Sequence, residues 1–164
     1  GQQEGLNSVI VNPGVILGPR IWGEGSGIFF KKIENGFPFY FKGSTGFIAV
    51  TDVVQLMVQL MKSEVKNERF ALVANTISFQ ELFNSMADVL KVKRPSVYVS
   101  PFVTGIIWRV DWFFSTFFRT KRILDKETAI ASYSKTSYSN EKIKNTLKVD
   151  FLNIHQYLKE NSSL

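Results

Sequence analysis

The 164-residue sequence contains no cysteine and a single histidine, His155. Disulfide bonds and thiolate chemistry are therefore excluded, and the composition fits a reducing compartment, so we expect a cytoplasmic protein. One imidazole cannot form a zinc-binding cluster, and the carboxylates are scattered without the spacing of a metal site. We expect no protein-bound metal ion.

The sequence also lacks a targeting segment and a concentration of charge. Residues 1–7 are polar and have neither the basic flank nor the apolar run of a signal peptide. The net charge of +6 is spread along the chain, and only Arg119, Lys121 and Arg122 form a tight basic cluster. Because no basic stripe is interleaved with aromatic residues, we expect no nucleic-acid partner.

Apolar and aromatic side chains are abundant. Hydrophobic residues make up 45% of the chain, and 15 residues are phenylalanine, which predicts broad apolar surfaces that face other elements, a ligand or a partner. The most apolar stretch, residues 101–118, has Arg109 and Asp111 at its centre. Each charge at a bilayer midplane would cost about 2.5 to 3.5 kcal/mol. We therefore interpret this stretch as a buried or partner-facing helix, with membrane-surface contact as the alternative.

Apolar periodicity and turn residues divide the chain into short strands and helices. Residues 1–5 indicate the end of a helix, and residues 8–12 a strand of the kind buried on both faces of a parallel sheet. Further strands are predicted at residues 39–41, 47–50, 69–74 and 97–99, and further helices at residues 26–35, 52–62, 78–94, 139–147 and 153–161. The irregular alternation favours an α/β or α+β unit with small sheets.

Particular residues are predicted to begin or turn these elements. Ser26 is placed as the N-cap of the first complete helix, and Thr51 or Asp52 as the cap of the helix that runs to about residue 62. Residues 43–46 are predicted to turn the chain because they begin and end with glycine. Ser78 begins the clearest helix, since the glutamate three residues later completes a capping box.

The same periodicity predicts which helix faces are buried. In the helix at residues 26–35, Ile28, Phe29 and Ile33 are expected to share one inward face. The helix at residues 52–62 is expected to be mostly buried. Its apolar residues are Val53, Val54, Leu56, Met57, Val58, Leu60 and Met61.

Three segments occur in an order that is more specific than any one of them. The first is NPGVILGP at residues 12–19, which by itself indicates only a buried strand that ends at a Pro-Gly turn. The second is FIAVTDVV at residues 47–54, preceded by Gly43, in which Asp52 is a helix-cap or first-turn acid. The third is SNEK at residues 139–142, followed by Leu147 and the final helical segment.

Together the three segments resemble the extended short-chain dehydrogenase/reductase family, which includes NAD(P)-dependent epimerases, dehydratases and dihydroflavonol reductases. The likeness is to the C-terminal half of such a protein, with the dihydroflavonol-reductase-like branch the nearest. It implies an α/β fold, the C-terminal part of an NAD(P)-binding Rossmann-fold protein, with one sheet strand plus a mixed α+β lobe. Residues 1–19 would end the Rossmann domain, and residues 20–164 would form the substrate-binding lobe with the C-terminal helices.

The resemblance also implies site residues. Those expected to bind the cofactor, NADP or NAD, are Asn12, Pro13, Gly14, Val15 and Ser26. Those expected to meet the substrate are Arg20, Trp22, Phe29 and Phe47. A plain helix N-cap for Ser26, a surface loop for Arg20 and Trp22, and core positions for Phe29 and Phe47 are the alternatives.

Two sequence patterns are similar to a dinucleotide-binding motif and to a catalytic pair, but neither has the position that the motif requires. The glycines at positions 23, 25 and 27 follow a loop, whereas a dinucleotide fingerprint needs a preceding strand and GxGxxG spacing. Tyr138 and Lys142 have the Tyr-x-x-x-Lys spacing of the family's catalytic pair, in which an ammonium lowers the pKa of the phenol. In the family that pair lies upstream of the Asn-Pro-Gly strand. We therefore expect no catalytic residue in this chain, and the catalytic residues before Gly1.

The resemblance implies a function for a longer protein. This chain would be the substrate-binding portion of an NAD(P)-dependent oxidoreductase or epimerase that acts on a small carbonyl or alcohol substrate, and it would be inactive alone. Its unpaired apolar surface would favour self-association, with a homo-oligomer as one form. The alternative is a non-catalytic relative that binds a dinucleotide or a partner protein. An upstream sequence that keeps the glycine turn but lacks the Tyr-Lys pair would indicate this alternative.

Overall fold

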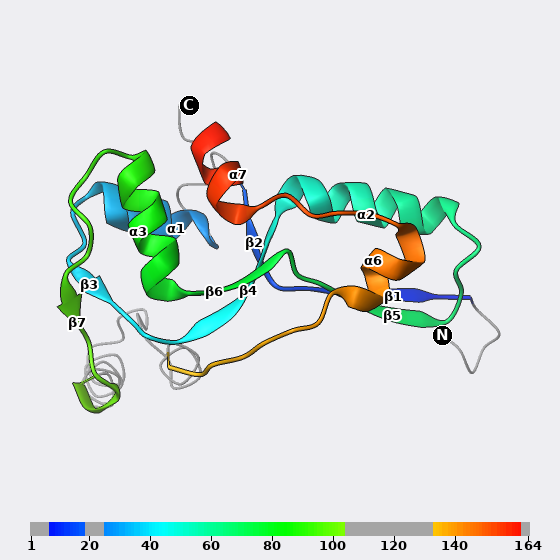
Figure 1. Ribbon diagram of the computed structural model, residues 1–164, viewed down its shortest axis with the longest axis horizontal. Coiled ribbons are helices and arrows are strands. Elements are labelled where there is room, and N and C mark those ends of the chain that lie inside the picture. The colour runs from blue at the N-terminus through cyan, green and yellow to red at the C-terminus, as the bar shows by residue number, and fades with distance from the viewer. Residues whose placement is uncertain (1–6, 19–24, 104–132, 162–164) are drawn as a thin grey trace, which may run out of the picture.

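The computed structural model describes residues 7–18, 25–103 and 133–161, which form an elongated arrangement of short strands and helices (Figure 1). The strands are β1 (Val9–Pro13), β2 (Val15–Leu17), β3 (Phe39–Tyr40), β4 (Ser44–Ala49), β5 (Glu68–Leu72), β6 (Asn75–Ser78) and β7 (Val97–Tyr98). The helices are α1 (Gly27–Glu34), α2 (Val50–Lys62), α3 (Phe79–Val89), α6 (Glu141–Leu147) and α7 (Ile154–Glu160). The fold is mixed α/β with parallel strand pairs, as the sequence predicts.

One end of the molecule is built on the parallel pair β1 and β5, which run in register from Val9 opposite Glu68 to Pro13 opposite Leu72. Helix α2 lies along this pair, and α6 packs near β5 (Figure 1). A hydrophobic cluster joins these elements. Its buried members are Ile48, Val53, Leu56, Leu60, Phe70, Leu72 and Ile143.

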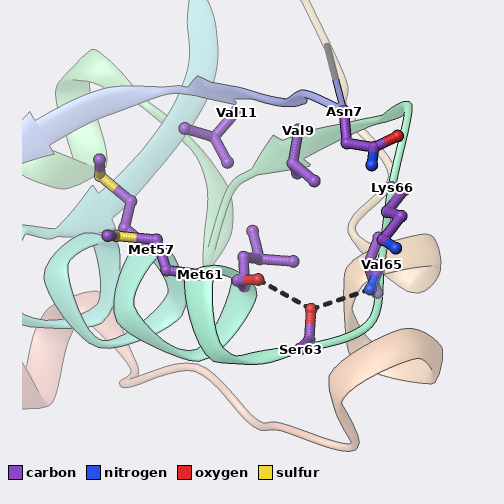
Figure 2. Close-up of a pocket in the computed structure, with 9 residues that line it drawn as sticks. Asn7, Val9, Val11, Met57, Met61, Ser63, Val65 and Lys66 are labelled. Atoms are coloured by element: carbon purple, nitrogen blue, oxygen red, sulfur yellow. Dashed lines mark hydrogen bonds between the residues drawn. The ribbon is translucent and has the colours of Figure 1, made fainter. Parts of the chain in front are cut away.

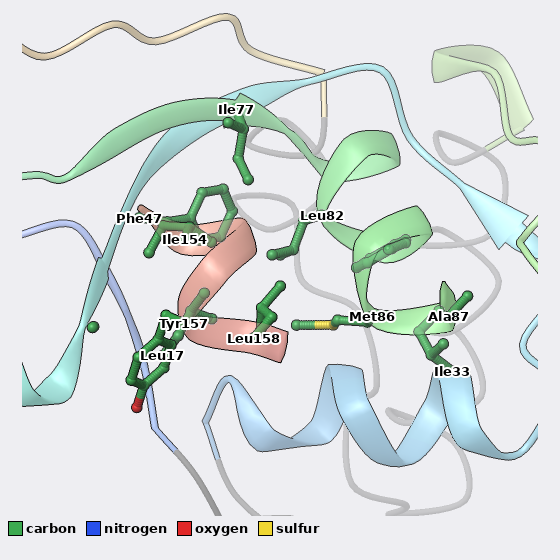
Figure 3. Close-up of a cluster of buried hydrophobic side chains, with 12 residues drawn as sticks. Leu17, Ile33, Phe47, Ile77, Leu82, Met86, Ala87, Ile154, Tyr157 and Leu158 are labelled. Atoms are coloured by element: carbon green, nitrogen blue, oxygen red, sulfur yellow. The ribbon is translucent and has the colours of Figure 1, made fainter. Parts of the chain in front are cut away.

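The other end contains a second hydrophobic cluster, between β4 and the helices α1, α3 and α7 (Figure 3). The periodic residues of α3 and α7 point into it, as the sequence predicts for amphipathic helices. Its fully buried large side chains are Leu17, Ile33, Phe47, Leu82, Met86, Ile154 and Leu158. Many of the described aromatic residues belong to this cluster or pack against it: Phe29, Phe30, Phe37, Tyr40, Phe41, Phe47, Phe79, Phe83 and Tyr157.

Both strands of the β1–β5 pair continue into a second sheet. Strand β2 pairs in parallel with β4, and β6 pairs with β4 from the other side in the antiparallel direction. The amide of Gly14 donates a 3.0 Å hydrogen bond to the carbonyl of Leu72, the last residue of β5. Two residues after Leu72, the amide of Ala74 donates a 2.9 Å hydrogen bond to the carbonyl of Phe47 in β4. The sequence did not predict β2.

The prediction of a turn at residues 43–46 is wrong, because Ser44 and Gly46 lie inside β4. A Cβ atom on Gly46 would lie 2.7 Å from both methyl groups of Val73. Gly46 thus leaves room for the Val73 side chain to pack directly against β4, and close packing is the other reason for a glycine within a strand. Sequence alone does not distinguish these two uses of glycine.

The predicted helix starts are only partly confirmed. Ser78 Oγ accepts a hydrogen bond from the amide of Glu81 at 3.1 Å, as expected for α3, although that helix ends at Val89 rather than reaching Pro95. Neither Thr51 nor Asp52 caps α2, whose N-cap position is held by Ala49 without a side-chain hydrogen bond. Asp52 lies in the first turn instead.

The prediction that α2 is mostly buried is wrong, because only one of its two apolar faces is buried. Val53, Leu56 and Leu60 are buried as expected. The remaining apolar side chains of the helix are exposed, namely Val54, Met57, Val58 and Met61. In α1, Ile33 is buried, but Ile28 is 40% exposed, so the predicted inward face is too wide.

Several predictions fall outside the described residues. They are the helix end at residues 1–5, Arg20 and Trp22, Gly23, the basic cluster at residues 119–122 and, beyond its first three residues, the helix at 101–118. The boundary placed between residues 19 and 20 falls in the same group and stays a prediction. In the described ranges, no helix is both long enough and apolar enough to cross a membrane.

Candidate functional site

The candidate site is the junction at residues 12–15. The predicted break after residue 12 is wrong, because β1 continues through Pro13, only Gly14 separates the strands, and β2 begins at Val15 in the second sheet. Asn12 and Pro13 are exposed, whereas Gly14 and Val15 are half-buried. Ligands of α/β proteins bind beyond the carboxyl ends of parallel strands, and this turn is at the carboxyl end of the β1–β5 pair. The junction therefore combines exposed residues with a position that suits a ligand.

Close backbone contact holds this turn in place. A Cβ atom on Gly14 would lie 2.4 Å from the carbonyl oxygen of Gly46 and 3.2 Å from a methyl group of Val73. Only glycine fits at this position between β1 and β2, because the backbone passes close to Gly46 in β4. Pro13, with its restricted φ, precedes this crossing point.

Ser26 lies beside the same segment although it is ten residues further along the chain. Its hydroxyl donates a 2.6 Å hydrogen bond to the carbonyl of Ile16 in β2 and does not cap α1. Ser26 therefore occupies the predicted N-cap position, since α1 begins at the next residue, but its side chain does not accept the hydrogen bond of a cap. The hydrogen bond fixes the first turn of α1 against β2, and amide groups at a helix start can receive an anionic group.

The two described residues expected to meet the substrate lie in the aromatic packing of the core. Phe47 has no exposed surface, and its ring meets that of Phe79 edge-on with centroids 6.0 Å apart. Phe47 therefore has the core position that was the alternative for it, and its contact with a substrate stays a prediction. Phe29 is half-buried and packs against Phe83 at 5.5 Å, which leaves part of its ring accessible. Arg20 and Trp22 lie outside the described residues.

Tyr138 and Lys142 do not work as a pair. The ammonium of Lys142 lies 2.6 Å from Glu68 Oε2 and 3.1 Å from the carbonyl oxygen of Arg69. Its hydrogen bond and charge lower the pKa of the Glu68 carboxyl. Tyr138 precedes α6 rather than lying on it, and its ring edge packs near Gly46. Lys142 thus joins α6 to β5.

Asp52 and Tyr157 form a buried polar spot between α2 and α7. Asp52 Oδ2 accepts a hydrogen bond from the amide of Leu152 at 2.9 Å, and burial raises the pKa of this carboxyl despite that bond. Burial, and then the nearby Asp52 charge, raise the pKa of the Tyr157 phenol. Within the described ranges the Tyr157 hydroxyl has no hydrogen-bond partner. Asp52 therefore ties the segment before α7 to the start of α2.

The sequence did not predict an apolar pocket of about 330 Å³ between β1 and α2 (Figure 2). Residues from both elements and from the chain after α2 line it: Asn7, Val9, Val11, Met57, Leu60, Met61, Ser63, Val65 and Lys66. The sequence signal that could have indicated this pocket is the wide apolar arc of α2, which has more apolar residues than one buried face requires. In the described part of the chain, no group of histidine and acidic side chains could hold a metal ion.

Known structures share this architecture. A nucleoside-diphosphate-sugar epimerase from Pseudomonas aeruginosa matches 98% of this chain with a TM-score of 0.73 and 18% identity. A UDP-glucose 4-epimerase from Thermotoga maritima, solved with UDP-glucose, matches 99% with a TM-score of 0.68 and 18% identity. A human epimerase family protein solved with NADPH matches 94% with a TM-score of 0.71 and 15% identity. The chain has the fold of part of these proteins.

The match covers only part of each similar structure. The chain spans 48% of the Pseudomonas aeruginosa and human proteins and 47% of the Thermotoga maritima protein. By sequence, no family model and no curated protein matches. At these sequence identities the similarity shows a shared fold, but it does not show a shared activity.

Proposed function

We propose that this chain is the substrate-binding part of an NAD(P)-dependent epimerase or reductase of the extended short-chain dehydrogenase/reductase family. The observation that carries the proposal is the crossing at Gly14, where an apolar parallel strand leaves one sheet and enters another at an exposed Asn-Pro turn. The similar structures support it, since they are described as epimerases and one was solved with NADPH.

The residues of the turn fit a cofactor ring. Asn12 and Pro13 offer exposed backbone and a rigid pyrrolidine, and the half-buried Val15 supplies an apolar contact. Ser26 holds the first turn of α1 beside β2, where its amide groups could receive a phosphate. NADP or NAD, when bound, would supply the hydride chemistry. These residues would position the ring, and Gly14 would set the distance between the turn and β4.

Proton transfer to or from a carbonyl or alcohol oxygen needs an acid–base group that this turn does not contain. We assign that role to an upstream Tyr-Lys pair, because Lys142 is bound to Glu68 and cannot assist Tyr138. The proposal therefore includes inactivity of residues 1–164 alone. The substrate class is a small molecule with a carbonyl or carbinol carbon.

The test compares residues 1–164 with the longer protein that the proposal requires, in which a cofactor-binding part would precede Gly1. We expect fluorescence titration to show NADPH or NADH binding by the full-length protein and none by residues 1–164. In the full-length protein Pro13→Ala should weaken binding about threefold to tenfold, since one lost contact is worth up to about 1.4 kcal/mol. Pro38→Ala is the matched control, because Pro38 is also exposed but lies beside β3.

Full-length protein without affinity for either nucleotide would refute the proposal. So would equal effects of Pro13→Ala and Pro38→Ala. Nucleotide binding with no hydride transfer to any carbonyl, together with an upstream sequence that lacks Tyr-x-x-x-Lys, would establish the non-catalytic binding alternative.

A further inference from the structure

The end of the molecule opposite the β1–β5 pair carries β3 and β7 and exposes apolar side chains (Figure 1). We call this surface the β3–β7 tip, and its members are the exposed side chains of Phe39, Val97, Tyr98, Phe102 and Val103. They come from the two strands and from the residues just after β7. Exposed apolar side chains gathered at one place mark an interaction site in a folded protein.

The strand register brings apolar side chains onto both faces of this short pair. Phe39 lies opposite Val97, and Tyr40 lies opposite Tyr98. Because successive side chains of a strand point to opposite faces, the first two project from one face and the tyrosines from the other. The rings of Tyr40 and Tyr98 are in contact, with centroids 5.7 Å apart. A sheet face in contact with water usually carries polar side chains, whereas both faces here carry apolar or aromatic ones.

Exposed lysines border the β3–β7 tip. The ammonium of Lys42 lies 4.5 Å from the ring centroid of Tyr98. That of Lys32 lies 5.5 Å from the ring centroid of Phe37, whose ring in turn contacts that of Phe39 at 5.4 Å. An ammonium over an aromatic ring keeps its charge in water while its stem covers apolar surface. Apolar side chains and positive charge therefore occur together on this surface.

The two segments that form the β3–β7 tip contain no aspartate or glutamate. Residues 35–51 and 89–103 contain four basic residues, namely Lys42, Lys91, Lys93 and Arg94. Of these, Arg94 is paired with Asp88 of α3 at 2.6 Å. Positive charge beside exposed apolar and aromatic side chains is complementary to an anionic lipid surface, which attracts the first and takes up the second.

We infer that the β3–β7 tip docks on a membrane surface that contains anionic lipid. Val97 and Phe102 would enter the boundary between headgroups and acyl chains. Tyr98 would lie at the level of the headgroups, where tyrosine is common, and Lys42 would meet lipid phosphate. Docking of this kind needs no helix that crosses the bilayer, and it does not depend on the proposed function.

A second copy of this chain suits the β3–β7 tip less well than a membrane does. A symmetric contact between two such surfaces would bring the lysines of both copies together. Like charges across an interface oppose association, whereas an anionic membrane surface attracts each of these lysines. Charge therefore favours lipid as the partner.

The test is flotation of residues 1–164 with vesicles of equal parts phosphatidylcholine and phosphatidylglycerol, compared with vesicles of phosphatidylcholine alone. The wild type should float with the anionic vesicles, and it should bind the neutral vesicles about tenfold more weakly or less. Val97→Ser/Phe102→Ser should lower the affinity for anionic vesicles about tenfold or more, because two apolar side chains no longer leave water.

The matched control is Val54→Ser/Met61→Ser on α2, which should change the affinity less than about twofold. Val54 and Met61 are 56% and 83% exposed, against 46% and 77% for Val97 and Phe102, so the control removes similar apolar surface elsewhere. Circular dichroism should show wild-type melting for both double variants. Phe102→Ser alone replaces the first one if that variant melts early.

Charge reversal tests the role of Lys42. Lys42→Glu should lower the affinity for anionic vesicles about fivefold or more, because attraction to the surface becomes repulsion. Lys66→Glu makes the same change in net charge at an exposed lysine beside the pocket between β1 and α2. It should lower the affinity less than about twofold, because the attraction falls off within a Debye length of the membrane.

A wild type that does not float, or that binds neutral and anionic vesicles equally, would overturn the inference. Equal losses in the Val97→Ser/Phe102→Ser variant and the α2 control would do the same, and so would equal effects of the two charge reversals. A Val97→Ser/Phe102→Ser variant that floats normally but no longer self-associates would also refute it, because the β3–β7 tip would then be a contact between copies of the chain.

Discussion

Glycine has two structural roles at the residue scale in this protein. Gly36 has a φ of 76°, which ends α1 in the left-handed conformation that favours glycine, as its position after the helix predicts. Gly14 instead lets its backbone approach the Gly46 carbonyl group, and Gly46 makes room for the Val73 side chain. The sequence pattern identifies the first role, because it depends on neighbours in the chain. The second depends on contacts more than 25 residues away.

Substitution of Gly14 tests the backbone crossing. In Gly14→Ala the added methyl group would meet the Gly46 carbonyl oxygen, which belongs to the backbone and cannot rotate away. We expect the free energy of unfolding to fall by about 2 to 3 kcal/mol, as for overpacked interiors, measured by urea denaturation. Gly18→Ala is the control, since its methyl group would be 3.5 Å from Val50, an ordinary contact. Equal effects of both substitutions would contradict the predicted clash.

Asp52 should make stability depend on pH. Burial raises its pKa in the folded chain, so the folded state binds a proton more tightly than the unfolded state does. The contribution of Asp52 is therefore fully present below the unfolded value near 3.8 and is lost as the pH rises through the raised folded value. Asp52→Asn removes this titration.

The measurement for Asp52 is urea denaturation of the wild type and Asp52→Asn at about pH 4 and near neutral pH. We expect the wild type to be more stable than Asp52→Asn by a larger free energy at the acidic pH than near neutral pH. The reason is that Asp52 keeps its proton in the folded state only at the acidic pH. A difference that grows toward neutral pH would show that the folded state favours the carboxylate. That result would mean that its hydrogen bond with Leu152 outweighs burial.

At the scale of elements, helix α7 is attached to α3 through a polar contact as well as through the core. His155 Nδ1 lies 2.7 Å from Ser85 Oγ, and its Nε2 lies 3.1 Å from Glu81 Oε1. Asn153 starts α7 by accepting a hydrogen bond from the amide of His155 at 2.9 Å. The sequence predicts both helices, but it offers no signal that His155 meets residues about 70 positions away.

Removal of the imidazole should weaken this attachment. His155→Ala is expected to lower the free energy of unfolding by about 1 to 2 kcal/mol, because two side-chain hydrogen bonds are lost. Gln156→Ala on the exposed side of α7 should cost less than about 0.5 kcal/mol. In a double-mutant cycle by thermal denaturation, His155→Ala and Ser85→Ala should be non-additive. Additive losses would show that the contact between the two helices contributes nothing.

Strands were harder to predict than helices for a related reason. The long α2 and the capping box of α3 carry local signals within a few residues. Strand β2 has only three residues, and it exists because β4 lies beside it. Its boundaries are therefore set by a partner more than 25 residues away, which local periodicity does not detect.

At the scale of the whole molecule, the described residues expose apolar side chains on α2 and β1, namely Val54, Met57, Val58, Met61 and Ile10. We expect this chain alone to self-associate, because exposed apolar area is removed from water on contact. Sedimentation velocity over a dilution series should give a mass above that of one chain at high concentration and approach one chain on dilution. A monodisperse monomer throughout the series would contradict the expectation.

The sequence by itself determined the mixed α/β class and most of the described helices, since these depend on short-range periodicity and on local capping residues. Only the tertiary structure decided that Ser26 bonds to Ile16, that Phe47 is core and that Lys142 is held by Glu68. It also decided that Val54, Met57, Val58 and Met61 of α2 stay exposed. Each of these depends on which distant segments meet. Hydrophobicity says that a side chain prefers burial, but the packing of the folded chain decides whether anything is there to bury it.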